Sequence, residues 1–385
     1  MLINRIIKDQ LLESLVPNKV VVLLGPRRVG KTVLINQLIK KVDEPYLLLS
    51  GEDFTTLSIL ERRSIQNYKN ILGKIRLLII DEAQKIPDVG NKLKLMVDHI
   101  EGLKILITGS SAFDIGNHVG EPLTGRKISY NLFALSEQEL MQTENVVEKR
   151  DNIRTRLVYG NYPELLQKTG DSDRAEYLRE VINSYLLKDI LTFEGIKNSD
   201  KIFRLLRLIA FQIGGEVSLQ ELGKQLSMSK NTVERYLDLL SKVFVLHRVG
   251  GFSRNLRKEV TKNSKWYFYD NGLRNLIIAN LNPIEQRNDI GMLWENYMIS
   301  ERIKYQRYHK MIVNNYFWRT YDQQEIDWVE ERGGKLYGYE FKWNPRKKVK
   351  VPGAWDKEYK ESEFEVIHPE NYLNWIIKED GVESI

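Results

Sequence analysis

The stretch that decides the fold is KVVVLLGPRRVGKTVLINQLIKK, residues 19–41. It opens with a continuous apolar run, residues 19–24, of the kind that a buried parallel strand requires. The next eight residues, Gly25 to Thr32, match the pattern G-x-x-x-x-G-K-[ST], and an amphipathic stretch follows from Val33 to Lys41. Strand, glycine loop and helix therefore come in the order that a phosphate-binding loop requires.

The residue types of this loop suit a triphosphate with its magnesium ion. The glycines let backbone N–H groups wrap around phosphate oxygens, Lys31 neutralises the β and γ charges, and the Thr32 hydroxyl is a ligand for Mg²⁺. The dipole of the following helix adds to this field. Arg27 and Arg28 occupy variable positions of the loop, where side chains are usually solvated. We expect ATP and Mg²⁺ as cofactors and assign the whole loop to their binding: Gly25, Pro26, Arg27, Arg28, Val29, Gly30, Lys31, Thr32 and Val33.

A second apolar run, residues 75–80, ends directly in the acidic pair Asp81-Glu82 and has the form of a Walker B strand. Asp81 is expected to hold Mg²⁺ through water, and Glu82 to orient or deprotonate the attacking water. Because both acids are present, the pattern favours hydrolysis over nucleotide binding alone, with Glu82 and Lys31 as the catalytic side chains. An exposed acidic turn after a core strand is the simpler alternative.

Small hydroxyl side chains follow a third apolar strand, residues 104–107. Thr108-Gly109-Ser110-Ser111 would lie at the carboxyl edge of a parallel sheet, where ligand sites of α/β folds form. Thr108 or Ser110 is therefore the candidate sensor of the γ-phosphate.

Further along, Arg126 precedes a β-like run, residues 128–133, and the capped helix start LSEQE at residues 135–139. This arginine is the best candidate for one that senses or completes a nucleotide site, either in its own subunit or across a subunit boundary. A solvated charge at a strand edge is an equally good interpretation.

Four segments, GPRRVGKT, LLIIDEAQKIPD, ILITGSSAFDI and LTGRKISYNLFALSEQEL, together resemble the AAA-like P-loop ATPases of archaea and bacteria. In that family the ATPase is joined to a C-terminal domain of unknown function. The resemblance extends over essentially the whole chain, with the specific motifs in the first 140 residues and the remainder matching mainly by layout. It implies an ATPase core, a winged helix and a terminal restriction-endonuclease-like fold.

The composition frames these motifs. A chain of 385 residues exceeds what one core usually organises, and its 42% hydrophobic and 29% charged residues are typical of a globular protein. The formal charge of +6 favours an anionic partner only mildly. The absence of cysteine excludes disulfides, zinc fingers and thiol catalysis. The amphipathic N-terminus is broken by Asp9 and Glu13 and reads as neither signal peptide nor membrane span, so we expect a cytoplasmic protein without a membrane partner.

The whole chain reads as an α/β protein of four segments. Residues 1–140 form the P-loop NTPase domain with its parallel sheet, and residues 141–200 a helical lid and linker around the turn GNYPE at residues 160–164. Residues 201–270 predict a winged helix-turn-helix, and residues 271–385 an α/β domain like the restriction endonucleases.

In the winged segment, residues 229–240 have the spacing of a recognition helix. Val233, Tyr236, Leu237 and Leu240 would point inward, while the outward residues would be Lys230, Asn231, Glu234 and Arg235. Residues 244–248 and 265–269 would form the wing, whose Arg254, Arg257 and Lys258 would meet phosphates. A module used for packing or regulation, without DNA contact, fits the same pattern.

The C-terminal segment predicts a β-hairpin from EIDWV, residues 325–329, through Gly333-Gly334 to YEFKW, residues 339–343. The period of two puts Glu340 and Lys342 on one face, which Asp327 can also reach. This D…E-x-K constellation is that of PD-(D/E)xK nucleases, in which carboxylates hold Mg²⁺ and a lysine activates water. Glu295, on a helix over residues 293–304, matches their additional acid. An ion-pair ladder on a sheet face is the alternative for Asp327, Glu340 and Lys342.

Three functions therefore remain open at the level of sequence. The first is an ATP-dependent DNA-processing enzyme that cuts at Asp327, Glu340 and Lys342. The second is a non-cutting ATP switch whose outer domains bind protein partners or another copy of the chain. The third is a transcription factor that reads DNA through residues 229–240.

Overall fold

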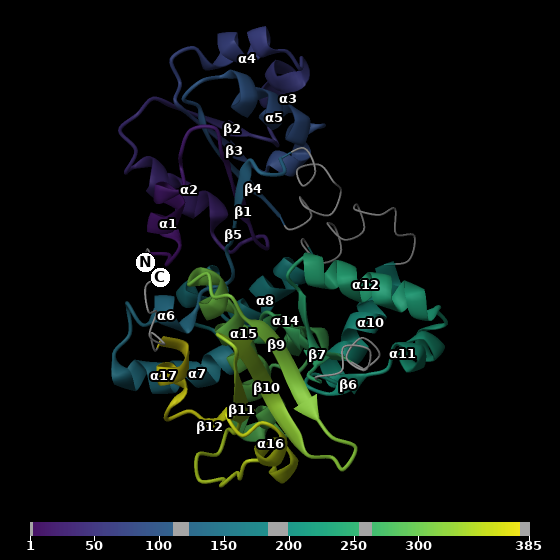
Figure 1. Cartoon of the computed structure of the whole chain (residues 1–385). Helices are drawn as coiled ribbons and strands as arrows, with labels where there is room; N and C mark the ends of the chain where they lie inside the picture. Colours follow the sequence, from purple (N-terminus) through teal and green to yellow (C-terminus); the bar gives the residue numbers. More distant parts are fainter. Residues whose placement is uncertain (1–2, 111–122, 184–198, 254–263, 378–385) are drawn as a thin grey trace.

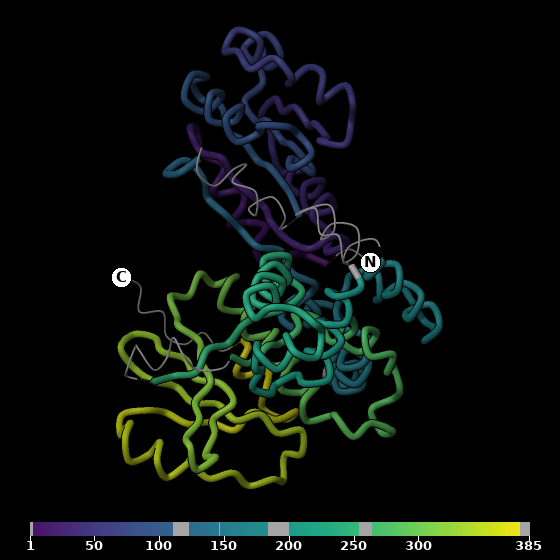
Figure 2. Tube along the Cα trace, turned by 90° about the vertical axis from the view of Figure 1, so that its right-hand side faces the viewer, coloured from purple at the N-terminus to yellow at the C-terminus, as the bar shows by residue number. Residues whose placement is uncertain are grey.

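The computed structural model describes residues 3–110, 123–183, 199–253 and 264–377. Two halves lie one above the other in both views, the first built on a five-stranded sheet and the second on a seven-stranded sheet (Figures 1 and 2). No helix of the described part is long and apolar enough to cross a membrane.

The first sheet is parallel throughout, in the order β2-β3-β4-β1-β5. Its core strands are apolar runs buried on both faces, which is the pattern of a parallel sheet covered by helices. The predicted strands at residues 19–24, 75–80 and 104–107 are confirmed as β1, β3 and β4. The strands are β1 Val20–Leu24, β2 Tyr46–Ser50, β3 Leu77–Asp81, β4 Lys104–Gly109 and β5 Lys127–Asn131.

Helices cover both faces of this sheet (Figure 1). Val21 and Leu23 of β1 pack in a cluster with the apolar residues of α1 and α2, while Val20 and Val22 pack with those of α3, α4 and α5. The first cluster continues into the second half, so the two halves share apolar core. These helices are α1 Lys8–Glu13, α2 Lys31–Ile39, α3 Phe54–Glu61, α4 Ile65–Leu72 and α5 Val89–His99, with the 3-10 turn η1 at Ala83–Lys85.

The segment after β5 is helical, as predicted. The expected capped start is confirmed at α6, where Ser136 and Glu139 form a capping box. Gly160 ends α7 with φ 78°, and Pro163 opens the 3-10 turn η3. The elements here are α6 Glu137–Leu140, α7 Val146–Tyr159, η3 Pro163–Gln167 and α8 Asp171–Val181.

The three helices expected in residues 201–270 are present, and the inward and outward faces of the third are confirmed. Val233, Tyr236, Leu237 and Leu240 are buried, and Lys230, Asn231, Glu234 and Arg235 are exposed. The wing residues Arg254, Arg257 and Lys258 lie outside the described residues. The elements are α10 Ser199–Phe211, β6 Glu216–Val217, α11 Leu219–Leu226, α12 Lys230–Lys242, β7 Leu246–Gly251 and β8 Ser264–Phe268.

The second sheet joins the winged segment to the C-terminal one. Its order is β12-β11-β10-β9-β7-β8-β6, and β7 pairs with β9 through Gly250 and Gly251. The residue ranges 201–270 and 271–385 therefore contribute to one continuous sheet. The predicted hairpin is confirmed as β10 and β11, joined at Gly333-Gly334. The strands are β9 Asn314–Arg319, β10 Glu325–Arg332, β11 Lys335–Phe341 and β12 Glu363–Ile367.

The helix α15 is the centre of this half. It packs against β8, β11, α14 and α17, and most of its residues are buried, including its last, Tyr308. The helices here are α14 Asn271–Ile277, α15 Ile290–Tyr308, α16 Gly353–Glu358 and α17 Tyr372–Ile377, with the 3-10 turn η5 at Ile284–Gln286.

Replacing Gly160 by alanine should destabilise the fold. An added Cβ would lie 2.0 Å from Asp270 Oδ1, and this carboxylate caps α14 by accepting from the backbone of Gly272 and Leu273. With the positive φ as a second cost, we expect a loss of about 2 to 4 kcal/mol in the free energy of unfolding, measured by urea denaturation.

The matched control is Gly291→Ala in the first turn of α15, where an added Cβ meets nothing within 4 Å. This change should be neutral or stabilise by about 0.5 to 1 kcal/mol. Equal unfolding midpoints for the two variants would contradict the role given to Gly160.

Candidate functional site

The glycine loop lies between β1 and α2, and its shape depends on two left-handed residues. Gly30 has φ 96° and Arg28 has φ 62°. At the start of the loop, a Cβ on Gly25 would lie 2.1 Å from the carbonyl oxygen of Leu132, so only glycine fits. The Lys31 ammonium lies inside the loop, 5% exposed, and donates to the carbonyl oxygens of Gly25 (2.9 Å) and Pro26 (3.0 Å). The loop thus surrounds a positive charge.

Asp81 lies beside this loop because β3 ends at the same edge of the sheet as β1. Thr32 Oγ1 donates to Asp81 Oδ2 at 2.8 Å, and the Thr108 hydroxyl donates to Asp81 Oδ1. Two hydroxyls therefore fix the carboxylate. One hydroxyl and one carboxylate are hard oxygen donors that suit Mg²⁺, an ion that usually keeps several waters.

Glu82 adopts a left-handed backbone conformation, φ 51°, which is uncommon for a residue with a side chain. Its carboxylate lies between Lys31, whose ammonium is 3.9 Å from Oε1, and Gln84, which donates to Oε2 at 2.6 Å. Gln84 also reaches Ser110 Oγ at 3.3 Å. Gln84 was not predicted as a residue of this site. Its position three residues after Asp81, in the segment DEAQ, could have indicated that it lies nearby.

A second group of titratable side chains lies on the seven-stranded sheet. Lys342 Nζ is 2.6 Å from Glu340 Oε1 and 3.8 Å from Asp327 Oδ2, so the predicted acid, acid and lysine are side by side. Asp327 also accepts from the backbone N–H of Phe341 at 2.9 Å. We call this group, with Glu295 and the residues below, the acid–lysine cluster.

Three further members of the cluster were not predicted. Lys265 of β8 forms an ion pair with Glu325 and lies 3.9 Å from Glu295 Oε1, and Tyr267 donates to Glu295 Oε1 at 2.6 Å. Lys265 is 2% exposed. The alternation of residues 264–268 would have placed Lys265 and Tyr267 on one face, but no local pattern indicates that β8 belongs to the same sheet as β10.

Comparison with known proteins gives three matches along the chain. Residues 17–141 match the model of an AAA domain, residues 150–284 a domain of unknown function (DUF8612), and residues 290–372 another domain of unknown function (DUF4143). The chain carries an AAA-family ATPase domain. Two domains of unknown function follow it.

The similar proteins are themselves uncharacterised. One from Mycobacterium tuberculosis is 27% identical over 328 residues, covering 84% of this chain and 70% of that protein. One from Haemophilus influenzae is 21% identical, covering 82% and 80%. Among solved structures, a variant of RuvB from Thermotoga maritima is 16% identical with a TM-score of 0.33, covering 64% of this chain and 90% of that one.

Arg126 does not join the AAA-domain site within its own chain. It precedes β5, and its carbonyl oxygen accepts from Val20 at the first residue of β1. The glycine loop follows the other end of β1, about 16 Å away for a five-residue strand. Arg126 instead pairs with Asp98 at 2.6 Å. Because a parallel strand begins at the edge opposite to the loop, Arg126 and the glycine loop of its own chain lie at opposite edges of the sheet.

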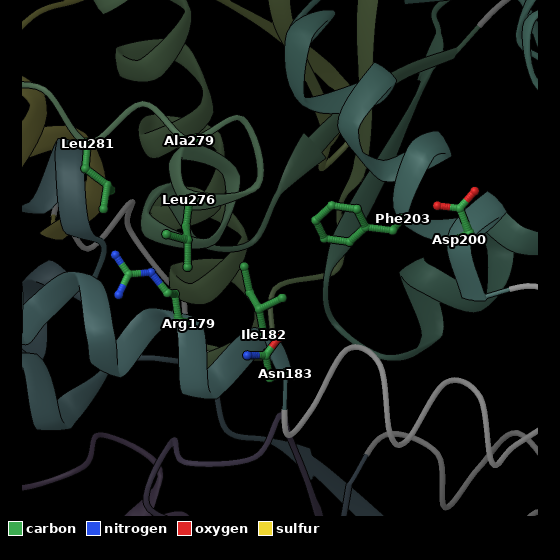
Figure 3. A pocket seen from close by; sticks show the side chains of 8 residues that line it. All are labelled: Arg179, Ile182, Asn183, Asp200, Phe203, Leu276, Ala279 and Leu281. Carbon is green, nitrogen blue, oxygen red and sulfur yellow. The ribbon is translucent and has the colours of Figure 1, made fainter.

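A pocket of about 450 Å³ adjoins the Thr32–Asp81 pair. It is lined by side chains from α2, the end of β2 and the start of α3, among them Ser50, Asp53 and Thr56. A larger pocket of about 640 Å³ lies elsewhere, between α8, α10 and the end of α14 (Figure 3). Its walls are mostly apolar, with Phe203 and Leu276 projecting into it, and no residue of either candidate site lines it.

The exposed face of α12 lines a third pocket, of about 740 Å³, together with β7 and β8. Its charged side chains are of both signs: Lys230, Glu234, Arg235, Asp238 and Arg248. A surface that binds the phosphate backbone is expected to be dominated by basic residues. The described part of this face does not have that character.

Burial changes the protonation of the acid–lysine cluster. Burial, and then the charge of Asp327, raises the pKa of Glu295 to about 8. Burial also raises the pKa of Asp327 and of Glu340. For Lys265, burial is outweighed by the charges of Glu295, Glu325 and Asp327, which raise its pKa. Both lysines of the cluster are therefore charged at neutral pH. Its three buried acids take up protons at a higher pH than ordinary carboxyl groups do.

In the structure, the carboxylates of the cluster lie against its two lysines. The described residues contain no group of three acidic or histidine side chains arranged to hold a metal. Glu340 Oε2 is buried without a hydrogen-bond partner. The predicted ligands Asp327 and Glu295 accept from Phe341 and Tyr267 and lie 3.8 and 3.9 Å from the ammonium groups of Lys342 and Lys265.

The raised pKa of Glu295 predicts a pH-dependent stability. The folded chain binds this proton more tightly than the unfolded chain does, so the free energy of unfolding should fall as pH rises from about 5 to about 8. In Glu295→Gln the fall should be smaller, though still present, since Asp327 and Glu340 shift in the same direction.

Urea denaturation of the two proteins at several pH values measures this difference. Glu361→Gln, on an exposed turn, is the control and should retain the full pH dependence. The same slope in Glu295→Gln as in the parent protein would show that Glu295 is not protonated in the fold.

Proposed function

We propose that the AAA domain binds Mg²⁺-ATP and hydrolyses it, and that its nucleotide state controls the two domains that follow. One observation carries the proposal: Lys31 and Thr32 come from the start of α2, Asp81 and Glu82 from the end of β3, and their side chains meet at one edge of the sheet. An exposed acidic turn would not bury a lysine against Glu82 or bind Asp81 with two hydroxyls.

The geometry suggests a role for each side chain. Lys31, inside the loop, would neutralise the β- and γ-phosphates. Thr32 and Asp81, which share a hydrogen bond, would together hold Mg²⁺ directly and through water. Glu82 would accept a proton from the attacking water or orient it, with Gln84 holding its other oxygen. Since Thr108 is used to hold Asp81, Ser110, which contacts Gln84, is the better candidate for the γ-phosphate sensor.

The loop is also in contact with the domain that follows. Arg28 Nη1 pairs with Glu180 of α8 at 3.1 Å, and its guanidinium lies 5.4 Å from the centre of the Tyr177 ring. A nucleotide that engages the loop would therefore alter a contact with α8. This contact supports an output through the helical segment.

We propose that the protein is a regulatory switch, in which nucleotide binding changes the two following domains without DNA cleavage. The mixed charge of the α12 face and the pairing of the acid–lysine cluster with Lys265 both favour it. Its partner would then be a protein or a second copy of the chain. DNA cleavage is the second candidate, because Asp327, Glu340 and Lys342 lie side by side.

Two variants test the ATPase. Lys31→Ala should weaken Mg²⁺-ATP binding by about a hundredfold, because it removes the charge inside the loop. Glu82→Gln should still bind ATP but lose about a hundredfold or more in turnover, since the amide cannot accept the proton. Isothermal titration and phosphate release measure the two effects. A folded protein that binds no nucleotide would refute the assignment.

A magnesium-dependent assay on linear and branched DNA tests the output. We expect no cleavage by the parent protein or by Lys342→Ala, and an ATPase rate unchanged by added DNA. Cleavage by the parent protein that Lys342→Ala abolishes would instead establish the nuclease. DNA binding that survives Lys31→Ala would favour a transcription factor.

A further inference from the structure

Arg5 is a buried arginine that lies before α1 and outside the part of the chain that matches the AAA model. It is 7% exposed, and its guanidinium contacts acceptors from three separate parts of the fold. Nη1 donates to the carbonyl oxygen of Val29 at 2.8 Å, in the glycine loop. Nε donates to Glu139 Oε1 at 2.9 Å, and Nη2 to the carbonyl oxygen of Phe133 at 2.6 Å.

The Val29 contact fixes a peptide bond of the loop. In a planar trans peptide the carbonyl oxygen of one residue and the N–H of the next point in opposite directions. Because Arg5 holds the Val29 oxygen on the buried side, the N–H of Gly30 points to the other side of that peptide. Gly30 immediately precedes Lys31, in the part of the loop whose N–H groups bind phosphate in the proposed function.

The guanidinium of Arg5 also contacts the C-terminal end of α15. Arg5 Nη2 is 3.3 Å from the hydroxyl of Tyr308, the last residue of that helix, and the same hydroxyl accepts from the backbone N–H of Phe133 at 3.2 Å. Gln10 donates to the Tyr308 carbonyl oxygen at 2.8 Å. The end of α15 is therefore attached to the AAA domain at the position of Arg5, while Glu295 of the acid–lysine cluster lies near the other end of the helix.

We propose that Arg5 is a positioning residue of the nucleotide site, which orients the Val29–Gly30 peptide for phosphate and connects that peptide to the C-terminal end of α15. This inference rests on the proposed ATPase function. Arg5 does not touch the phosphates itself, because its guanidinium is turned to the buried side of the loop.

Only arginine suits this place. Its planar fork presents donors in several fixed directions, whereas a lysine ammonium is a single centre on a flexible stem. An ammonium at position 5 would keep the positive charge opposite Glu139 but could not reach Val29, Phe133 and Tyr308 together. Arg5→Lys is therefore a test of geometry at constant charge.

The experiment compares Mg²⁺-ATP affinity, kcat and KM in three variants of the full chain. Arg5→Lys should weaken Mg²⁺-ATP affinity by about tenfold or more, with KM raised more than kcat is lowered, since the general base is unchanged. Tyr308→Phe removes the hydroxyl of α15 that accepts from Arg5. It should weaken Mg²⁺-ATP affinity by a smaller factor than Arg5→Lys does. This second variant also keeps the test open if Arg5→Lys does not fold.

The matched control is Arg156→Lys. Arg156 is also buried, 4% exposed, and pairs with Glu137 and Glu144, but it has no contact with the loop. Its replacement should lower stability comparably and leave nucleotide affinity within about twofold of the parent protein. An equal loss of affinity in Arg156→Lys would mean that both arginines act through stability alone.

Amide hydrogen exchange gives the second readout. ATP should slow exchange in the last turn of α15 in the parent protein and not in Arg5→Lys or Tyr308→Phe. Unchanged affinity in folded Arg5→Lys, or protection of α15 by ATP in that variant, would overturn the inference. Failure of the parent protein to bind ATP would instead refute the proposed function itself.

Discussion

The attachment of α6, the first helix after the five-stranded sheet, to the helices of the second half depends on a buried carboxylate, that of Glu137 (Figure 1). Arg156 donates to both of its oxygens, at 2.8 and 3.0 Å, and the Tyr297 hydroxyl of α15 also donates to it. The backbone N–H of Glu137 in turn donates to Glu301 at 2.7 Å. Moving α6 away from α7 and α15 would leave these charges without partners, which costs several kcal/mol for each buried ion. The chain that leaves β5 is therefore held at α6 against α7 and α15.

The sequence predicted that Lys31, Thr32, Asp81 and Glu82 lie together, because this grouping depends on local patterns. Strand, loop and helix follow one another directly, and Asp81 and Glu82 terminate an apolar run that can only be a buried strand. The position of Arg126 could also be read from the sequence: it precedes its strand, and residues before a parallel strand lie at the edge away from the loop. The edge strand β2 was not predicted, although its sequence YLLLS is an apolar run, and in the structure this strand is only partly buried.

The C-terminal cluster was predictable only in part. Asp327, Glu340 and Lys342 lie on one hairpin, so the period of two was enough to bring them together. Lys265 and Tyr267 join them through the pairing of β7 with β9, which links residues about 65 positions apart in the chain. Neither periodicity nor turn signals specify such a pairing. Arg5 is a similar case, since its acceptors Val29, Glu139 and Tyr308 are distant in sequence and its burial follows only from the assembled fold.

The seven-stranded sheet has a consequence for dissecting this protein. The N–H of Phe252 donates to the carbonyl oxygen of Phe317 at 2.6 Å, which extends the ladder between β7 and β9. A fragment that ends between α14 and α15 would expose β7 as an open edge of unpaired backbone groups, and the complementary fragment would expose β9 in the same way. Such edges recruit strands from other molecules and lead to aggregation. The two domains of unknown function should therefore be expressed together in one fragment, although they match two separate family models.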